Sequence, residues 1–162
     1  MRLFLALLFA VAAAATPVDF SGSWTLSLKE SDNLDPLMEL TGRNFFERKA
    51  AKTLSVTQII EQTDDTLEVT VKSMMVTMKE VMKTDGSVVE SKGRDGTPVT
   101  STTSWEGNEL VTHTTAKLKS GEIMPIVFAR ALSEDGQTMY QIIRYEWEGQ
   151  AYELKRVFQR KE

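Results

Sequence analysis

The feature that most limits the fold of this sequence is a series of short segments in which apolar and polar side chains alternate. These segments follow one another from about residue 54 to the end of the chain. The stretches between them are rich in turn residues, for example Thr84-Asp85-Gly86 and Glu106-Gly107-Asn108. Alternation is typical of half-buried β-strands, and glycine next to Asp or Asn is typical of tight hairpin turns. The chain is therefore predicted to form an antiparallel meander.

Ten strands are expected, with one helical interruption. The strands are expected at 20–28, 54–63, 67–73, 74–83, 87–92, 97–105, 109–117, 123–132, 137–146 and from about 150 to the end. Residues 30–52 lack the alternation and are predicted to form two short helices split at Thr41-Gly42, the first capped by Asp32 or Asn33. An even up-and-down series of this length closes into a barrel. The predicted fold class is all-β: a ten-stranded up-and-down antiparallel β-barrel (a β-clam) with a helix-turn-helix lid between strands one and two.

The first residues have the pattern of a secretory signal peptide. Arg2 precedes an apolar run from Leu3 to Ala15, which ends in small residues and is too short to span a bilayer as an anchor. We expect residues 1–15 to be the signal peptide and residues 16–162 to be a single barrel domain. The protein is then expected outside the cell or in the lumen of the secretory pathway.

Composition and motifs disfavour several classes of function. The chain has 19 Lys and Arg against 23 Asp and Glu, so a general nucleic-acid-binding role is disfavoured. It has no cysteine, which excludes disulfides, thiol nucleophiles and thiolate metal sites. No serine-hydrolase, phosphate-loop or metal-spacing motif is present. We therefore expect no enzyme activity, no cofactor and no metal.

Two arginines stand on apolar strand faces. In the final strand, Arg156 shares a face with Leu154 and Phe158, and Arg130 stands among the large apolar residues of 123–132. A buried cation is costly unless an anion or water meets it. Two guanidiniums converging in one cavity would be suited to hold a carboxylate. Glu80 is an alternative partner inside the barrel, and the residues alone leave both interpretations open.

The order of these parts resembles the fatty-acid-binding protein family of the calycins, cellular retinoid-binding proteins included. The resemblance covers about residues 19–162 and is carried by the sequences FSGSWTL, ESDNLDPLMELTG, RNFFERKAAK and KRVF. Three features differ from the family pattern. The family is mostly cytosolic whereas this chain has a signal sequence, the last hairpin looks longer, and Arg156-Val157-Phe158 replaces a closing Arg-x-Tyr.

The resemblance implies a site for a ligand carboxylate. Arg130 and Arg156 match the two arginines that bind it in the family, and Phe158 matches the tyrosine that completes the triad, here without its hydroxyl. Loss of one hydrogen bond, about 1 kcal/mol, weakens such a site without abolishing it. Strand alternation suggests that the cavity is lined by Met74, Val76, Met78, Thr112, Thr114 and Phe128, and the resemblance adds Tyr140 and Ile142. Core packing is the alternative role for the methionines.

Two further roles are implied by the resemblance. Trp24 is expected to close the narrow end of the barrel. The expected portal lid consists of Arg43, Phe45, Phe46, Arg48 and Lys49, where basic residues can meet anionic membranes. An ordinary solvated helix face is the alternative interpretation of this segment.

The expected function is that of a secreted, monomeric, non-enzymatic carrier of a long-chain fatty acid or similar hydrophobic carboxylate. Its expected partners are this ligand and, transiently, anionic membranes, but not nucleic acid. Two alternatives remain: a filled barrel that acts as an interaction protein, and a haem- or retinoid-binding barrel. The only histidine, His113, is expected to point outward, which disfavours haem.

Overall fold

The computed structural model describes residues 18–162 as one antiparallel sheet and two short helices. The predicted signal peptide at residues 1–15 lies outside the described residues. The elements follow the chain in the order β1 (Gly22–Leu26), α1 (Asp35–Leu40), α2 (Phe45–Ala51), β2 (Thr57–Gln62), β3 (Thr66–Lys72), β4 (Thr77–Lys83), β5 (Asp85–Lys92), β6 (Pro98–Glu106), β7 (Glu109–Lys117), β8 (Ile123–Leu132), β9 (Thr138–Trp147) and β10 (Gln150–Arg160). The predicted ten strands and the helix pair after the first strand are confirmed.

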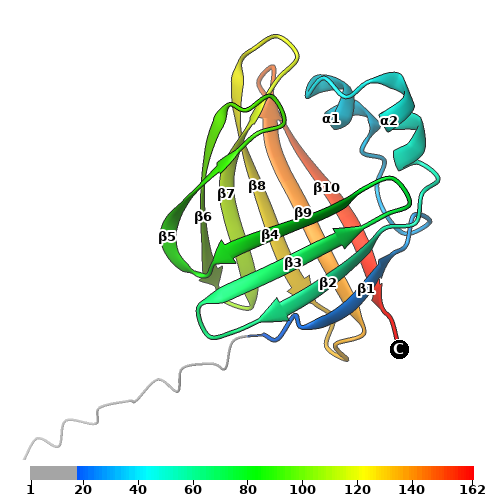
Figure 1. Ribbon diagram of the computed structural model, residues 1–162, viewed down its shortest axis with the longest axis vertical. Coiled ribbons are helices and arrows are strands. Elements are labelled where there is room, and N and C mark those ends of the chain that lie inside the picture. The colour runs from blue at the N-terminus through cyan, green and yellow to red at the C-terminus, as the bar shows by residue number, and fades with distance from the viewer. Residues whose placement is uncertain (1–17) are drawn as a thin grey trace, which may run out of the picture.

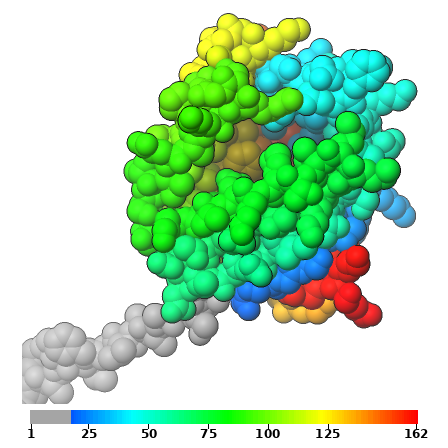
Figure 2. Space-filling view, viewed as in Figure 1, coloured from blue at the N-terminus to red at the C-terminus, as the bar shows by residue number. Residues whose placement is uncertain are grey.

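The strands form a nearly closed barrel with one gap. Their order across the sheet is β4-β3-β2-β1-β10-β9-β8-β7-β6-β5, and β1 joins the two halves by pairing with β10. In the described chain, β4 and β5 stand at opposite ends of this order and share no ladder of hydrogen bonds. Figure 1 shows the two strands diverging, and Figure 2 shows a hollow beside β4 with atoms in the colours of β8 and β9 at its floor. The barrel interior is therefore open to solvent between β4 and β5.

The two helices lie across one end of the barrel (Figure 1). Helix α1 is anchored by Leu37, which is buried among side chains of the barrel interior. The Lys119 amide of the β7–β8 turn donates a 2.8 Å hydrogen bond to the Leu40 carbonyl at the end of α1. The lid is thus fixed to the barrel through its first helix.

The helices begin in different ways. Helix α1 has Leu34 at its N-cap position, without a side-chain cap, but the side chain of Asn33 accepts a 3.0 Å hydrogen bond from the Asp35 amide in the first turn. Of the two expected capping residues, Asn33 therefore contacts the start of the helix and Asp32 does not. The Asp32 carboxylate instead accepts a 2.7 Å hydrogen bond from the Lys155 amide of β10, which ties the β1–α1 connection to the barrel wall. Helix α2 begins with a capping box between Asn44 and Glu47, in which each side chain accepts from the other residue's amide.

The barrel interior contains two clusters of buried apolar side chains. The closed-end cluster lies away from the lid and contains Phe20, Trp24, Leu26, Ile60, Leu67, Val69, Met82, Leu110, Met139 and Phe158. The lid cluster lies beneath α1 and contains Leu37, Leu118, Met124, Ile126, Ile143 and Tyr145, with Phe128 and Leu154 packed against it. These clusters supply the apolar surface that stabilises a cysteine-free barrel.

Candidate ligand-binding cavity

A row of polar side chains crosses the barrel between the two apolar clusters. Arg130 of β8 lies opposite Gln141 of β9, which lies opposite Arg156 of β10. Residues directly opposite each other on antiparallel strands point to the same face. This face is the interior, because Met139 and Ile143, two positions either side of Gln141, belong to the closed-end and lid clusters. Both arginines predicted from the sequence therefore face inward. Their backbones are roughly 10 Å apart, because they lie two strands apart and neighbouring strands are spaced by about 4.8 Å.

Arg130 is a buried cation with little to neutralise it. The residue is 5 % exposed, and its Nη1 atom lies 3.8 Å from the Met82 sulfur, which is a weak acceptor. The Arg130 Nε atom has no hydrogen-bond partner within the described chain. Burial lowers the pKa of Arg130, and the negative charge of Glu80 partly offsets this effect. The Nε–H group of this guanidinium is therefore available to donate a hydrogen bond to a ligand inside the barrel.

Arg156 is less deeply placed than Arg130. It is half-buried, and its Nε atom also lacks a hydrogen-bond partner among residues 18–162. Burial lowers the pKa of this guanidinium as well. Arg156 also lines a cavity of about 290 Å³ that is bounded by the β1–α1 connection and by both lid helices. A ligand group held by Arg156 can therefore be reached from beneath the lid.

Glu80 faces the same interior from β4. It lies opposite Val69, a member of the closed-end cluster, so its side chain is on the inner face of β4, where it is exposed to solvent beside the gap. Its charge acts on Arg130, although no ion pair joins the two residues in the described structure. The predicted internal partner is thus within electrostatic range of Arg130 but leaves the guanidinium donors free.

Three of the predicted lining residues lie on the interior face. Thr112 and Phe128 are directly opposite each other, and Thr114 lies opposite Ile126 of the lid cluster. The Thr112 hydroxyl is 2.8 Å from the hydroxyl of Thr103, a residue for which the sequence predicted no role. The wall formed by β6 and β7 therefore carries hydroxyl groups next to the arginine row.

The prediction that Tyr140 and Ile142 line the cavity is wrong. In β9 the interior residues are the odd-numbered ones from Met139, which is fully buried in the closed-end cluster. Tyr140 pairs with Val157 and Ile142 with Lys155, both on the opposite face of the sheet. A register shift of one residue moves every side chain of a strand to its other face. The residue that this shift brings inside is Gln141.

The segment that contains Met74 forms a turn before β4 and not the expected start of a strand that lines the cavity. Ser73 to Val76 form the β3–β4 turn, closed by a 2.9 Å hydrogen bond from the Ser73 amide to the Val76 carbonyl. Met74 is 90 % exposed at this turn, so it does not line the cavity, and Val76 is exposed at the barrel rim. Met78 faces inward opposite Val71 but borders the gap and is exposed. Only Met82, farther along β4, is part of the core.

The end of the barrel opposite the lid is closed by packing around Trp24. This side chain is fully buried, its Nε1 donates a 2.9 Å hydrogen bond to the Phe20 carbonyl, and the Arg160 guanidinium lies 4.2 Å from its ring centroid. Phe158 is buried in the same cluster, one row below Arg156. A phenyl ring has no hydrogen-bonding group, so Phe158 forms an apolar floor beneath the polar row and has no donor for a ligand carboxylate.

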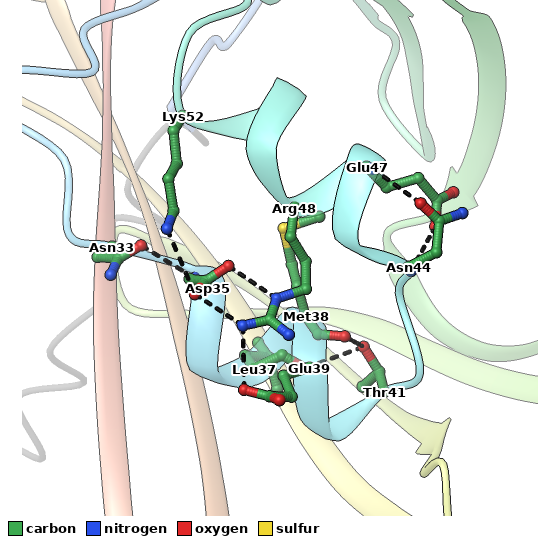
Figure 3. A network of polar contacts seen from close by, with 10 residues as sticks. All are labelled: Asn33, Asp35, Leu37, Met38, Glu39, Thr41, Asn44, Glu47, Arg48 and Lys52. Atoms are coloured by element: carbon green, nitrogen blue, oxygen red, sulfur yellow. Dashed lines mark hydrogen bonds and ion pairs between the residues drawn. The ribbon is translucent and has the colours of Figure 1, made fainter.

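The lid is held together by ion pairs between its two helices. Arg48 of α2 donates two hydrogen bonds, 2.8 and 2.9 Å long, to the Asp35 carboxylate of α1, and a third contact of 3.0 Å joins it to Glu39. Lys52 lies 3.4 Å from the same Asp35 carboxylate (Figure 3). The Arg48 guanidinium lowers the pKa of Asp35 to about 2. Arg48, predicted as a basic residue of the portal lid, is therefore paired with acidic residues of α1.

A second contact connects α2 to the rim of the barrel. The Glu47 carboxylate, already part of the capping box, lies 2.6 Å from the Arg94 guanidinium of the β5–β6 turn. Arg43 lies 4.0 Å from Glu47, and burial lowers the pKa of Arg43. Helix α2 has no buried residue. It is therefore held across the mouth of the barrel by ion pairs and not by apolar packing.

The outer side of α2 is apolar and exposed. Phe45 and Phe46 are 68 % and 78 % exposed, and their rings contact each other edge to face. Lys49 is exposed, and no ion-pair partner for it is found in the described part of the chain. The predicted lid residues therefore present two aromatic rings and one lysine to the solvent.

Features of other functional classes are missing from the cavity. His113 lies on the outer face, 3.6 Å from Glu106, so it is not placed to bind a haem inside the barrel. Residues 18–162 contain no group of His, Cys, Asp and Glu side chains that could hold a metal ion. Within the same residues, neither helix has the length and apolarity needed to cross a membrane.

Solved structures resemble this chain over nearly its whole length. Human cRBP IV superposes with a TM-score of 0.69 at 26 % identity, over 90 % of this chain and 100 % of the other. Lipid binding protein 8 of Caenorhabditis elegans gives 0.70 at 21 % identity, over 88 % and 95 %. The Schistosoma mansoni fatty acid binding protein in complex with arachidonic acid gives 0.70 at 22 % identity, over 88 % and 96 %. No family model and no curated protein matches the sequence.

The chain therefore has the fold of the fatty-acid-binding and lipid-binding proteins. The resemblance expected from its sequence is confirmed for the fold. These identities are too low to carry binding residues across, so the roles of the interior side chains rest on the geometry of this chain.

Proposed function

We propose that this protein is a secreted, monomeric, non-enzymatic carrier that binds a long-chain fatty acid or a similar hydrophobic carboxylate inside its barrel. The observation that carries the proposal is the buried Arg130 guanidinium, whose Nε has no hydrogen-bond partner in the described chain and which shares an interior row with Arg156. Burial of a cation in an apolar interior costs several kcal/mol unless an anion meets it. A ligand carboxylate supplies this anion, and apolar side chains on both sides of the row accept its chain.

The site is suited to a head group that enters from the lid side. Arg156 borders the cavity under the helices, and Phe158 below it forms an apolar floor. Arg130 and Arg156 donate charge-assisted hydrogen bonds to the carboxylate, directly or through water. The alkyl chain contributes about 25 cal/mol for each Å² of apolar surface that binding removes from water. The complex of the Schistosoma mansoni protein with arachidonic acid supports a ligand of this class for the same fold.

Secretion and transient membrane contact are parts of the same proposal. The sequence of residues 1–15 supports export, and the lack of cysteine fits a domain that needs no disulfide in an oxidising compartment. Phe45, Phe46 and Lys49 on the outer side of α2 supply the apolar and cationic groups for a brief contact with an anionic bilayer. Mass determination of the N-terminus of protein exported by expressing cells tests the cleavage site.

The test of the carboxylate site compares a charged ligand with a neutral one. Replacement of Arg156 by Leu is expected to weaken oleic acid binding about tenfold or more, while binding of oleyl alcohol changes by no more than about threefold. Fluorescence displacement titrations of both ligands measure this ratio. Arg144→Leu is the matched control, because Arg144 faces outward and pairs with Glu153. Equal losses for both ligands in Arg156→Leu would contradict a carboxylate site.

A further inference from the structure

The outer face of strand β8 is apolar, although it is the face that points away from the barrel interior. Its outward residues are Ile123, Pro125, Val127, Ala129 and Ala131. A strand with one face in water usually places its polar side chains on that face. β8 reverses this pattern, because its only charged side chain, Arg130, points inward. The outer face of β8 is therefore not explained by contact with water.

Part of this face belongs to a pocket of about 500 Å³ that β8 shares with β9 and β10, which form the wall behind β3 and β4 in Figure 1. We call it the outer pocket. Its floor contains the apolar side chains of Pro125, Val127 and Ala151. Val127 lies directly opposite Arg144, which faces outward, so the outer pocket is separate from the ligand cavity inside the barrel. Apolar depressions with a polar rim are typical of interaction sites.

The rim of the outer pocket is negatively charged. Arg144 pairs with Glu153 at 2.9 Å, and no ion-pair partner for Glu146 is found among residues 18–162. The pKa of Arg144 is raised, mainly by its hydrogen bond to Glu153 and further by the charges of Glu109 and Glu106. Carboxylates thus outnumber guanidiniums around the pocket, and the surface there favours a cation.

The charge of the rim discriminates between the possible occupants of the outer pocket. A second copy of this chain would bring one acidic rim against another, and like charges that face each other oppose association. An anionic bilayer is disfavoured for the same reason. A protein segment with an apolar side chain between basic ones suits both parts of the site. Its apolar side chain fills the pocket while its cations lie against the carboxylates of the rim.

We infer that the outer pocket of β8, β9 and β10 is a docking site for a partner protein, through a segment in which an apolar side chain lies between basic residues. The floor at Val127 receives the apolar side chain, and Glu146 pairs with one of the basic ones. Because the pocket and the ligand cavity lie on opposite faces of the sheet, the protein can hold a ligand and a partner at the same time. The inference does not depend on the proposed carrier function.

A labelled synthetic peptide with one leucine between two pairs of lysines tests the site by fluorescence anisotropy. Val127→Ser in the floor and Glu146→Lys in the rim are each expected to weaken its binding at least about fivefold, through lost apolar burial and reversed charge. Glu90→Lys is the matched control, because it makes the same change of charge on the exposed strand β5. Circular dichroism establishes that the three variants fold.

Two altered peptides test the chemistry of the partner. A peptide with serine in place of leucine, and one with glutamates in place of the lysines, are each expected to bind at least about tenfold more weakly than the original. The inference is wrong if the three peptides bind equally, if the original does not bind, or if Val127→Ser and Glu146→Lys leave its affinity unchanged. It is also wrong if Glu90→Lys weakens binding as much as Glu146→Lys, which would indicate unspecific attraction by charge.

The other possible occupants have measurements of their own. Sedimentation of the wild type might reveal a dimer that Val127→Ser dissociates, and the pocket would then be a contact between copies of this chain. Binding to phosphatidylglycerol vesicles that Val127→Ser abolishes would assign the pocket to a bilayer. Either result would overturn the inference, whereas a monomer that binds the original peptide and leaves the vesicles free supports it.

Discussion

At the scale of single residues, Arg130 is a buried cation in the candidate ligand site. Its guanidinium is buried next to the Met82 sulfur, with Glu80 in range but not bonded to it. The surrounding core would be filled as well by an apolar side chain of similar length. We therefore expect Arg130 to be unfavourable for folding and favourable for ligand binding.

Replacement of Arg130 by Met is expected to raise the free energy of unfolding of the ligand-free protein by roughly 1–3 kcal/mol, because apolar residues often stabilise sites of buried charge. Urea denaturation measures this change. The same variant is expected to bind oleic acid at least about tenfold more weakly. A loss of stability in Arg130→Met would show that the guanidinium is paired or hydrated in the ligand-free protein.

Residue identity alone could locate the arginines but not the amide between them. Arg130 and Arg156 stand out because a cation on an apolar strand face is unusual. Gln141 sits in the sequence Tyr140-Gln141-Ile142, where the apolar neighbours suggest that the glutamine faces outward. The turn before β9 sets the parity of that strand, and this turn brings Gln141 inside while placing Tyr140 outside.

At the scale of elements, the lid is a helix pair whose cohesion comes from charges. Asp35 of α1 receives both Arg48 and Lys52 of α2, as Figure 3 shows. Helix α2 contributes no buried residue, so these ion pairs and the Glu47–Arg94 contact hold it in place. A lid of this kind is expected to respond to pH and to salt.

The pKa of Asp35 gives the direction of the pH response. Because its folded pKa is lowered from 3.8 to about 2, its stabilising contribution is present above pH 4 and is lost as the pH falls through 2. Asp35→Asn is expected to lower the Tm at pH 7 and to leave it unchanged relative to the wild type below pH 2. Thermal unfolding followed by circular dichroism from pH 7 to about pH 1 measures the difference. A constant difference between the two proteins across this range would exclude Asp35 as the titrating group.

At the scale of the whole molecule, the gap between β4 and β5 makes the two sides of the barrel unequal. The strands β8 and β9 are paired on both sides, whereas β4 and β5 each have one free edge in the described sheet. β5 is almost entirely exposed, and the apolar side chains of Val81 and Val88 lie near the gap open to solvent. We expect this side to open more readily than the β8–β9 side, since local stability follows burial and hydrogen bonding.

Hydrogen exchange tests this asymmetry directly. Peptides from β4 and β5 are expected to exchange at least about tenfold faster than peptides from β8 and β9. Saturation with oleic acid at about 100 times its Kd is expected to add about 2.7 kcal/mol of stability and to slow exchange throughout the barrel. Equal exchange rates for the two sides would mean that β4 and β5 pair in solution.

The sequence by itself determined the class of fold, the number of strands, the place of the helices and the two interior arginines. These follow from local patterns, since alternation defines strands, Asp-Gly and Gly-Asn pairs define turns, and a charge on an apolar face stands out within one strand. Only the tertiary structure decided that Gln141 joins the arginines, that Met74 lies in a turn and that Arg48 is held by Asp35 and Glu39. The physical reason is that these features depend on strand register and on contacts between segments far apart in the chain, which no local pattern contains.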